Sequence, residues 1–398
     1  MLGSRIRRPG GSRARATRLA ATAGTVLALI TSGTAFAGSA AGQAAQAAQL
    51  ASAPPPAALA ALYCRTLTNC VAIGANNPQN PTSLVMERWN GVRWSRSALP
   101  ASAGAVNASV SPASVACPTA RECVAVGLAS DAGGPLVEYW NGSRWSLGPA
   151  ATPNGLPSGL IYFILTAISC PAPRDCYAVG SFMGVGSTET NPLIEHWNGS
   201  TWSVQTEGGM GAWLTGISCR TTAFCVAVGS GIEGSGPIAD VWNGRTWTGM
   251  AVPWAGPVQI SGVTCPATTS CFAVGSYLIG NGSLVERWNG KTWSAAHTPG
   301  PAASVSQGLA SVSCASPLRC LAVGNYAGNG VYAVAWNGLG WHRVSVAPVN
   351  GRLGYVEQVQ CPSATRCVAL GATNSNAATQ RFESAFWNGR TWRVVPTA

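Results

Sequence analysis

The sequence has few charged side chains and almost no lysine. Asp, Glu, Lys and Arg make up 9% of its 398 residues, and Lys291 is the single lysine beside 23 arginines. Six arginines fall within the first 18 positions, leaving 18 of the 24 basic residues against 13 acidic ones, a net charge of +5. Those 18 are scattered, without the basic run or basic face that neutralises phosphates. We therefore expect no nucleic-acid partner.

Long apolar runs are also absent, apart from one short segment at 19–30. This segment is rich in Ala, Thr and Gly and falls well below the ~20 strongly apolar residues of a membrane span. It follows the arginine-rich start and precedes Ala35-Phe36-Ala37, which completes the three parts of a secretory signal peptide. We expect cleavage after residue 37, no span in the mature chain, and a secreted protein, extracellular or associated with the cell wall. Retention of residues 1–37 as a signal anchor is the structural alternative.

No cysteine stands alone, and the histidines do not cluster. The 14 cysteines occur only as C-x5-C pairs, at 64/70, 117/123, 170/176, 219/225, 265/271, 314/320 and 361/367. In an exported protein, one fixed local spacing predicts a disulfide within each pair. The alternative, a metal cluster or redox thiols, is disfavoured because His196, His297 and His342 share no ligand spacing. We expect no metal and no cofactor.

The cysteine pairs belong to a sevenfold repeat. A W-N-G-x-x-W motif follows each pair, with its first Trp at 89, 140, 197, 242, 288, 336 and 387. The repeats are 46 to 53 residues long and contain all 14 cysteines and 14 of the 16 tryptophans. They fill residues 59–398. Residues 38–58, rich in Ala, Gln, Ser and Pro, precede them and are expected to form a disordered tether.

Each repeat has four strand-like segments, A to D. Strand A ends at the first cysteine, as in Ala310–Cys314, with an apolar residue two positions earlier, the period-2 pattern of a strand. Strand B runs from the second cysteine to a glycine, as in Cys271–Gly275. Strands C and D flank Asn-Gly, the strongest short-range hairpin signal. The period and the strand number predict an all-β fold, a seven-bladed β-propeller with four antiparallel strands and one disulfide per blade.

The segment AVGSYLIGNGSLVERWNGKTW at 273–293 resembles a kelch repeat, in which a glycine closes the second strand, a Val-Glu-x-aromatic strand follows, and a Trp opens the fourth. The resemblance covers all seven repeats, although Gly275 stands alone where kelch repeats have two glycines, and the cysteine pair is additional. The chain is thus similar to secreted bacterial kelch-like proteins grouped with the galactose oxidase central domain. The copper chemistry of galactose oxidase is not implied, because its paired histidines and free cysteine have no counterparts.

An acidic residue stands two positions before the first Trp in five repeats. These residues are Glu87, Glu138, Glu195, Asp240 and Glu286. Side chains alternate along a strand, so the acid and the Trp share one face. Because a catalytic carboxylate must differ from its neighbours, we interpret the repeated acid as a hydrogen-bond or ion-pair partner, and the tryptophans as packing between blades.

The connections differ between the two ends of the predicted blades. The spacing across A-B and C-D is constant, whereas the B-C segment from Gly to Trp varies from 12 to 17 residues and the D-A segment from Trp to Cys from 17 to 25. Variable loops on a rigid scaffold usually carry binding residues. We predict ligand contacts by the aromatic residues of these segments, namely Trp213, Trp254, Tyr162, Phe163, Tyr326 and Tyr355. The alternative is that such rings plug the loop bases or pack on the next blade.

We expect a monomeric binding module, not an enzyme, that recognises a carbohydrate or a protein through its B-C/D-A loop face. A glycan-active hydrolase or lyase is the alternative, and it requires carboxylates that break the sevenfold pattern. The candidates for that role are Asp131, Glu189, Glu207, Glu233 and Glu357. A purely structural surface protein is a third interpretation. Ring closure stays open, because either blade 7 packs directly on blade 1 or the blade boundaries are shifted.

Overall fold

The computed structural model describes fourteen segments of the chain: 58–75, 84–98, 110–129, 134–151, 160–184, 189–207, 211–231, 236–253, 257–278, 282–299, 307–326, 330–346, 353–373 and 381–398. The chain divides into two units, Met1–Pro54 and Pro55–Ala398, and the described residues all belong to the second. The predicted signal peptide, 1–37, and the predicted tether, except Ala58, lie outside them. None of these segments contains a helix of the length and hydrophobicity that a membrane span requires.

The described residues form 28 strands in seven four-stranded sheets. Blades 1 to 4 contain β1 (Ala58–Thr66), β2 (Asn69–Ala75), β3 (Leu84–Trp89), β4 (Trp94–Ala98); β5 (Val110–Ala116), β6 (Cys123–Ala129), β7 (Gly134–Trp140), β8 (Trp145–Leu147); β9 (Leu160–Ala172), β10 (Asp175–Gly184), β11 (Asn191–Trp197), β12 (Trp202–Glu207); β13 (Ala212–Thr221), β14 (Phe224–Gly231), β15 (Pro237–Trp242) and β16 (Trp247–Met250). Blades 5 to 7 contain β17 (Val258–Ala267), β18 (Ser270–Tyr277), β19 (Gly282–Trp288), β20 (Trp293–Ala295); β21 (Gln307–Ser316), β22 (Arg319–Tyr326), β23 (Gly330–Trp336), β24 (Trp341–Val344); β25 (Tyr355–Ser363), β26 (Arg366–Ala372), β27 (Phe382–Trp387) and β28 (Trp392–Pro396).

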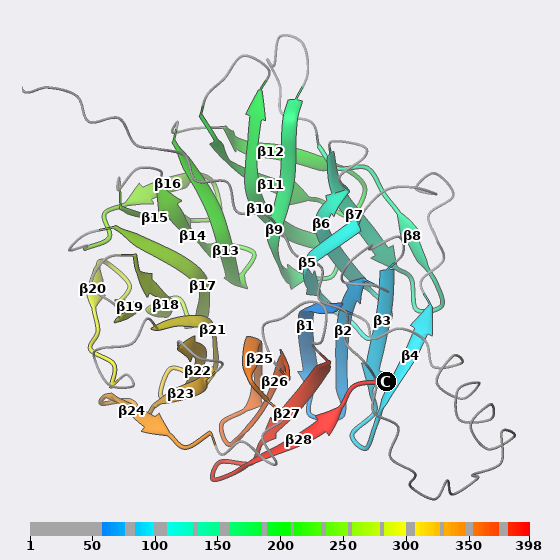
Figure 1. The fold of residues 1–398 in the computed structure, drawn as a ribbon. Helices are drawn as coiled ribbons and strands as arrows, with labels where there is room; N and C mark the ends of the chain where they lie inside the picture. The colour runs from blue at the N-terminus through cyan, green and yellow to red at the C-terminus, as the bar shows by residue number, and fades with distance from the viewer. Residues whose placement is uncertain are drawn as a thin grey trace, which may run out of the picture. The chain divides into compact units, whose positions relative to one another are not determined.

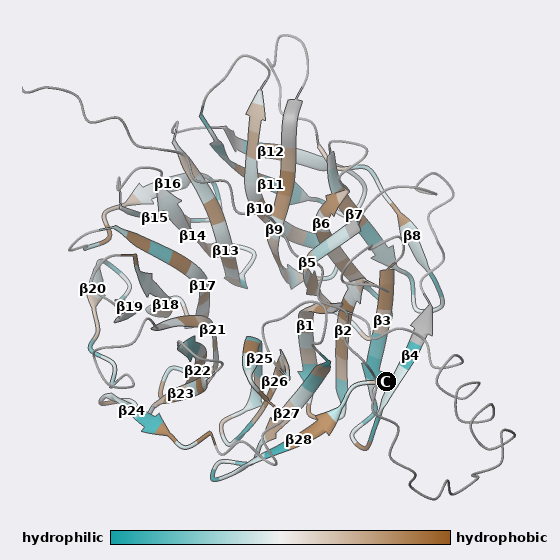
Figure 2. Ribbon diagram, viewed as in Figure 1, coloured by the Kyte–Doolittle hydropathy of each residue, from teal (hydrophilic) through white to brown (hydrophobic). Residues whose placement is uncertain are grey.

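Each sheet is a meander in which consecutive strands pair antiparallel, so the predicted seven-bladed β-propeller with four strands per blade is confirmed. Figure 1 shows the seven inner strands, β1, β5, β9, β13, β17, β21 and β25, around the middle of this unit and the fourth strands at its rim. In Figure 2 inner strands such as β9 and β13 carry hydrophobic segments, whereas β24 at the rim is largely hydrophilic. The sheets therefore bury their apolar residues between blades.

The two hairpin turns of a blade lie together at one end, and both were predicted from the sequence. All seven C-x5-C pairs form disulfides across the A-B hairpin, with Cα–Cα distances of 3.9 to 4.1 Å. In blade 5, Asn289 Oδ1 accepts backbone hydrogen bonds from Lys291 and Thr292, both at 2.9 Å, and Gly290 has a φ of +97°. A side chain at Gly290 would approach Thr269 of the A-B turn at 3.1 Å, which shows that the two turns touch.

Seven apolar clusters fill the seven contacts between neighbouring blades. The second tryptophan of the motif is buried in six blades, and Trp247 in blade 4 is half-buried. Large aromatic side chains bury on the order of 150–250 Å² each, so this repeated position supplies much of the packing between sheets. The predicted packing role of the tryptophans agrees with this arrangement.

The ring closes by direct packing of blade 7 on blade 1, without a strand shared between the two sheets. The Gln358 side chain accepts a hydrogen bond from Leu62 N at 2.7 Å and donates one to Ala60 O at 2.9 Å. The C-terminal residue, Ala398, donates its backbone N–H to Glu87 at 2.8 Å. The first of the two closures considered from the sequence is therefore the one observed.

At the acidic position of strand C, Glu195 and Glu87 accept hydrogen bonds from the preceding blade, whereas Glu138 and Glu286 each keep a buried Oε2 atom without a hydrogen-bond partner. Glu195 accepts from Ala151 N of the preceding blade at 3.2 Å, and Glu87 accepts from Ala398 as described above. Both donors stand six residues after the second Trp of their motif. In blade 4 this place is taken by Pro253, which has no N–H, and the Oε2 atom of the next acid, Glu286, is buried without a hydrogen-bond partner.

Candidate functional site

A β-bulge in every inner strand creates a ring of side chains around the propeller axis. The bulge falls four residues before the first cysteine, where one residue of strand A is left out of the pairing with strand B. The glycine that ends strand B lies beside it. A Cβ at Gly275 would stand 1.9 Å from the Gln259 carbonyl oxygen, so only glycine fits there. The single glycine of each repeat thus marks a close backbone approach.

The bulge residues line a central cavity of about 740 Å³. They are Ala60, Ala113, Thr166, Thr215, Ser261, Ala310 and Glu357. The Thr166 hydroxyl donates to Leu214 O of the next blade at 2.8 Å, and the Thr215 hydroxyl to Ile260 O at 2.9 Å. Six of the seven bulge residues are therefore small or carry a hydroxyl group, and the seventh introduces a carboxyl group.

Glu357 is the one charged side chain among the described residues that line the cavity. Burial raises the pKa of its carboxyl group to about 7. Tyr355, two residues earlier on β25, also lines the cavity, and its pKa is raised by burial and by the charge of Glu357. Tyr63 of blade 1 and Gln360 of blade 7 belong to the same wall. The cavity is therefore polar, and the titratable groups of its described lining lie on blades 7 and 1.

The aromatic residues that were predicted to form one binding surface lie in different parts of the structure. Tyr355 lines the cavity at the start of β25, where the D-A segment enters the blade. Trp213 occupies the same strand position in blade 4, six residues before the first cysteine, and is half-buried beside the cavity wall without belonging to it. The side chain of Tyr162 and all of Trp254 lie outside the described residues.

Two further aromatic residues of that group pack inside the propeller. Phe163 is 3% exposed in the apolar cluster between blades 2 and 3. Tyr326 is half-buried, packs on the cluster between blades 5 and 6, and lies 6.4 Å from Tyr332, measured between ring centroids. For these two residues the structure matches the packing alternative raised from the sequence.

The symmetry-breaking carboxylates are not brought together within the described residues. Glu357 lies in the cavity, whereas Glu189 precedes β11 and is half-buried elsewhere in the blade. Glu207 ends β12, and its side chain, like all of Asp131 and Glu233, lies outside the described residues. The sequence signal that could have located the cavity is the repeated single glycine, because it marks the bulge that turns residue 357 inward.

The comparisons with known proteins bear on the fold. No protein-family model matches the chain, and no curated protein matches it. Among solved structures, YCF48 from Cyanidioschyzon merolae is 14% identical with a TM-score of 0.51, covering 80% of this chain and 94% of that one. YCF48 bound to D1 peptide is 15% identical with a TM-score of 0.52, covering 80% and 90%. A PL25 ulvan lyase bound to -[GlcA(1-4)Rha3S]- is 10% identical with a TM-score of 0.54, covering 86% and 96%.

These identities are too low to transfer a ligand or an activity, and they show a shared propeller fold. The class of protein is therefore a seven-bladed β-propeller with one disulfide in each blade.

Proposed function

We propose that this chain is a secreted propeller that binds a carbohydrate at the Tyr355 end of its central cavity. The observation that carries the proposal is the pair formed by Tyr355 and Glu357, which breaks the sevenfold pattern of an otherwise small and hydroxyl-rich lining. Sugar sites combine an aromatic face with a few placed polar groups, and volumes of about 300–1,000 Å³ are usual for ligand pockets. The kelch-like repeat and the export signal at residues 1–37 are part of the same proposal.

The negative charge in the cavity limits the classes of sugar that are expected to bind. Because Glu357 is the one charged group of the described lining, an anionic sugar finds no counter-charge there, whereas a neutral or amino sugar does not meet repulsion. A group with a pKa of about 7 is increasingly ionised from pH 6 to 8. We therefore expect affinity for an amino sugar to rise as Glu357 ionises, up to the pH at which the sugar's own ammonium group loses its proton, and affinity for a neutral sugar to change little.

The test is a glycan array probed with the mature chain, followed by titration of any retained glycan. Tyr355→Ala is expected to weaken binding about tenfold or more, as loss of an aromatic anchor does. Gln259 occupies the equivalent strand position in blade 5 and is exposed, so Gln259→Ala is the matched control and is expected to bind normally. Glu357→Gln is expected to remove the pH dependence. If Tyr355→Ala binds as tightly as the unaltered protein, the cavity is not the site.

A lyase is the second candidate, and the single carboxyl group of the described lining favours it over a hydrolase. A carboxylate with a pKa of about 7 is suited to accept a proton at neutral pH. Glycoside hydrolysis generally uses two carboxyl groups, and the described lining contributes one. Unsaturated products released from an array-positive polysaccharide would establish the lyase, and their loss in Glu357→Gln would assign the base. Retention of a protein instead of any glycan would favour the protein-ligand alternative.

A further inference from the structure

The residue just before the first Trp of each W-N-G motif faces the neighbouring blade, and we call it the seam residue. The seam residues of blades 1 to 7 are Arg88, Tyr139, His196, Val241, Arg287, Ala335 and Phe386. Each is carried by the third strand of its blade, and those of blades 1, 2, 5 and 7 lie against the first Trp of the following blade. Their chemistry varies from blade to blade, so the seven seams differ even though the motif is repeated.

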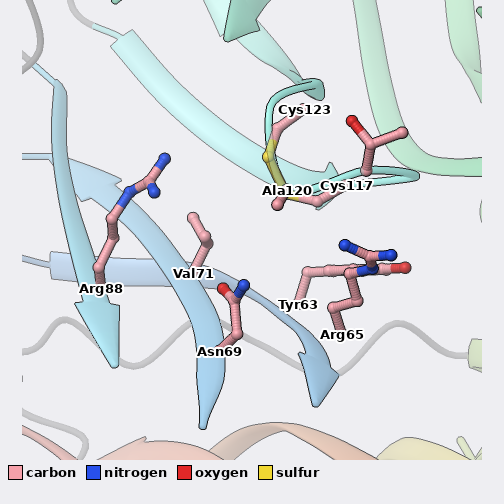
Figure 3. Close-up of a pocket in the computed structure, with 9 residues that line it drawn as sticks. Tyr63, Arg65, Asn69, Val71, Arg88, Cys117, Ala120 and Cys123 are labelled. Carbon is pink, nitrogen blue, oxygen red and sulfur yellow. A yellow bond between two sulfur atoms is a disulfide. The ribbon is translucent and has the colours of Figure 1, made fainter. Parts of the chain in front are cut away.

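Arginine covers the neighbouring indole at two seams. The guanidinium carbon of Arg88 lies 4.4 Å from the ring centroid of Trp140, and that of Arg287 lies 5.2 Å from the ring centroid of Trp336. Figure 3 shows Arg88 extending from its strand on one side of the seam between blades 1 and 2, opposite the disulfide of blade 2. A cavity of only about 10 Å³ is left at this seam. The arginine side chain thus fills the space beside the indole.

Aromatic rings cover the neighbouring indole at two other seams. The Tyr139 and Trp197 ring centroids are 5.0 Å apart, and those of Phe386 and Trp89 are 4.4 Å apart. A groove of about 570 Å³ remains at the first of these seams, but there the indole already has a ring stacked on it. An intramolecular planar group is therefore the usual occupant of this position.

The next two seams are filled in other ways. Between blades 3 and 4, Tyr177 lies 5.8 Å from Trp242, measured between ring centroids. Between blades 4 and 5, Trp288 is 4% exposed, and Phe224 and Val241 pack in the apolar cluster that contains it. Trp242 is half-buried beside the Tyr177 ring, and Trp288 is covered by the apolar side chains of its cluster.

At the seam between blades 6 and 7, no ring or guanidinium group of blade 6 stacks on the Trp387 indole within the described residues, and the apolar Leu321 lines the space beside it. The seam residue here is Ala335, whose methyl group cannot reach across the neighbouring indole. Within the described part of the chain, the one ring contact of Trp387 is with Trp392 of its own hairpin, at 5.4 Å, and Trp387 stays half-buried. A pocket of about 330 Å³ lies here, lined by Ala335, Trp387 and residues of the two blades, and we call it the seam 6/7 socket.

The rim of the socket indicates which planar group fits. Arg319 is held at the rim by hydrogen bonds from Nη1 to Leu318 O at 3.3 Å and to Asn337 O at 3.1 Å. His342 is exposed on the same rim, and the described lining contains no acidic side chain. A second guanidinium group would be repelled by Arg319, whereas an uncharged aromatic ring would not. The chain's own Tyr139 and Phe386 show that such a ring fits beside this indole.

We propose that the seam 6/7 socket binds a phenyl or phenol ring from a side chain of a partner polypeptide, stacked on Trp387. The ring would occupy the place that Tyr139 and Phe386 take at their own seams. The socket lies at the A-B/C-D turn end of the blades, so the proposal is independent of carbohydrate binding at the Tyr355 end of the cavity.

The test uses the mature, disulfide-bonded chain with N-acetyl-tyrosinamide and p-cresol as probes, measured by equilibrium dialysis and by the NMR shifts of the indole N–H groups. One saturable site is expected, with a dissociation constant on the order of millimolar for a ligand of this size. Ala335→Tyr supplies an intramolecular ring and is expected to weaken probe binding about tenfold or more. Ala335→Ser, which leaves the socket open, is expected to bind as the unaltered chain does.

A gain-of-site variant sharpens the test. Phe386→Ala uncovers Trp89 at the seam between blades 7 and 1, and is expected to raise the stoichiometry from one probe to two. The proposal is overturned if Ala335→Tyr and Ala335→Ser bind p-cresol equally well, or if no probe saturates. It is also overturned if methylguanidine or methyl glucoside, but not p-cresol, shifts the Trp387 signal. The Ala335 pair decides the question even if Phe386→Ala does not fold.

Discussion

Gln358→Ala is expected to weaken the closure of the ring. Blades 7 and 1 share no strand, and Gln358 on β25 links them by accepting from Leu62 N and donating to Ala60 O. Alanine removes both hydrogen bonds while keeping the backbone geometry of the strand. The substitution therefore tests whether the hydrogen bonds of one amide side chain stabilise the closure of a ring whose first and last blades share no strand.

The magnitude follows from the burial of the two groups left behind. Leu62 is 2% exposed, and loss of the hydrogen bond to its N–H costs about 1–3 kcal/mol, at the lower end if water reaches it from the cavity that Leu62 also lines. Ala60 lines the central cavity, where its carbonyl oxygen can accept from water, at a smaller cost. We expect a loss of about 2–3 kcal/mol in the free energy of unfolding.

The matched control is Ser311→Ala at the same strand position in blade 6. Ser311 Oγ accepts one hydrogen bond, from Val359 N at 3.2 Å, across a seam inside the ring, and its removal is expected to cost about 1 kcal/mol. Urea unfolding followed by tryptophan fluorescence, with the disulfides intact, measures both variants. The reasoning is refuted if Gln358→Ala unfolds at the same urea concentration as the unaltered chain, or if Ser311→Ala costs more than Gln358→Ala.

Three further predictions concern stability. Replacing Cys314 and Cys320 together by Ser should cost about 2 kcal/mol, because the bridge closes a small loop; an unchanged calorimetric midpoint would contradict this. Gly290→Ala should cost about 1–2 kcal/mol, since its φ is +97°, whereas Gly340→Ala, with open space around it, should be nearly neutral in the same melts. Burial raises the pKa of Glu286 to about 7, so the folded state holds its proton more tightly than the unfolded state, and the contribution of this group to stability should fall as the pH rises from about 4.5 to 7. Glu286→Gln should flatten that decline in pH-dependent unfolding, and a parallel decline in both proteins would argue against it.

The candidate site could be reached from the sequence only in pieces. Tyr355 was predicted as an aromatic residue of a variable segment, and Glu357 as a carboxylate that breaks the repeat pattern. Both residues reach the cavity because of the bulge at residue 357. The bulge interrupts the alternation of side chains along the strand, so the face of each residue cannot be assigned from the sequence by counting every second position. The repeated glycine signals that bulge, but its partner, the carbonyl group of another strand, is visible only in three dimensions.

The contacts at the seams between blades are even harder to predict from the sequence. Ala335 is one residue of a hairpin whose motif is otherwise intact, and nothing local distinguishes it from a surface alanine. Its importance comes from Trp387, which lies 52 positions away in the sequence and belongs to the next blade. Contacts between blades are made by side chains. The strand pairing within each sheet therefore does not predict which side chains of two neighbouring blades meet.

The number of blades, the strands within them, the seven disulfides and the Asn-Gly turns could all be predicted from the amino-acid sequence. These features follow from local spacing, because a hairpin brings residues a few positions apart into contact and repeats the same geometry seven times. How the ring closes, which side chains reach the central cavity and which seam leaves a socket became visible only in the folded chain. Those outcomes depend on the packing of one sheet against another, where a single changed side chain, such as Ala335 or Glu357, alters a site that the repeated pattern leaves the same.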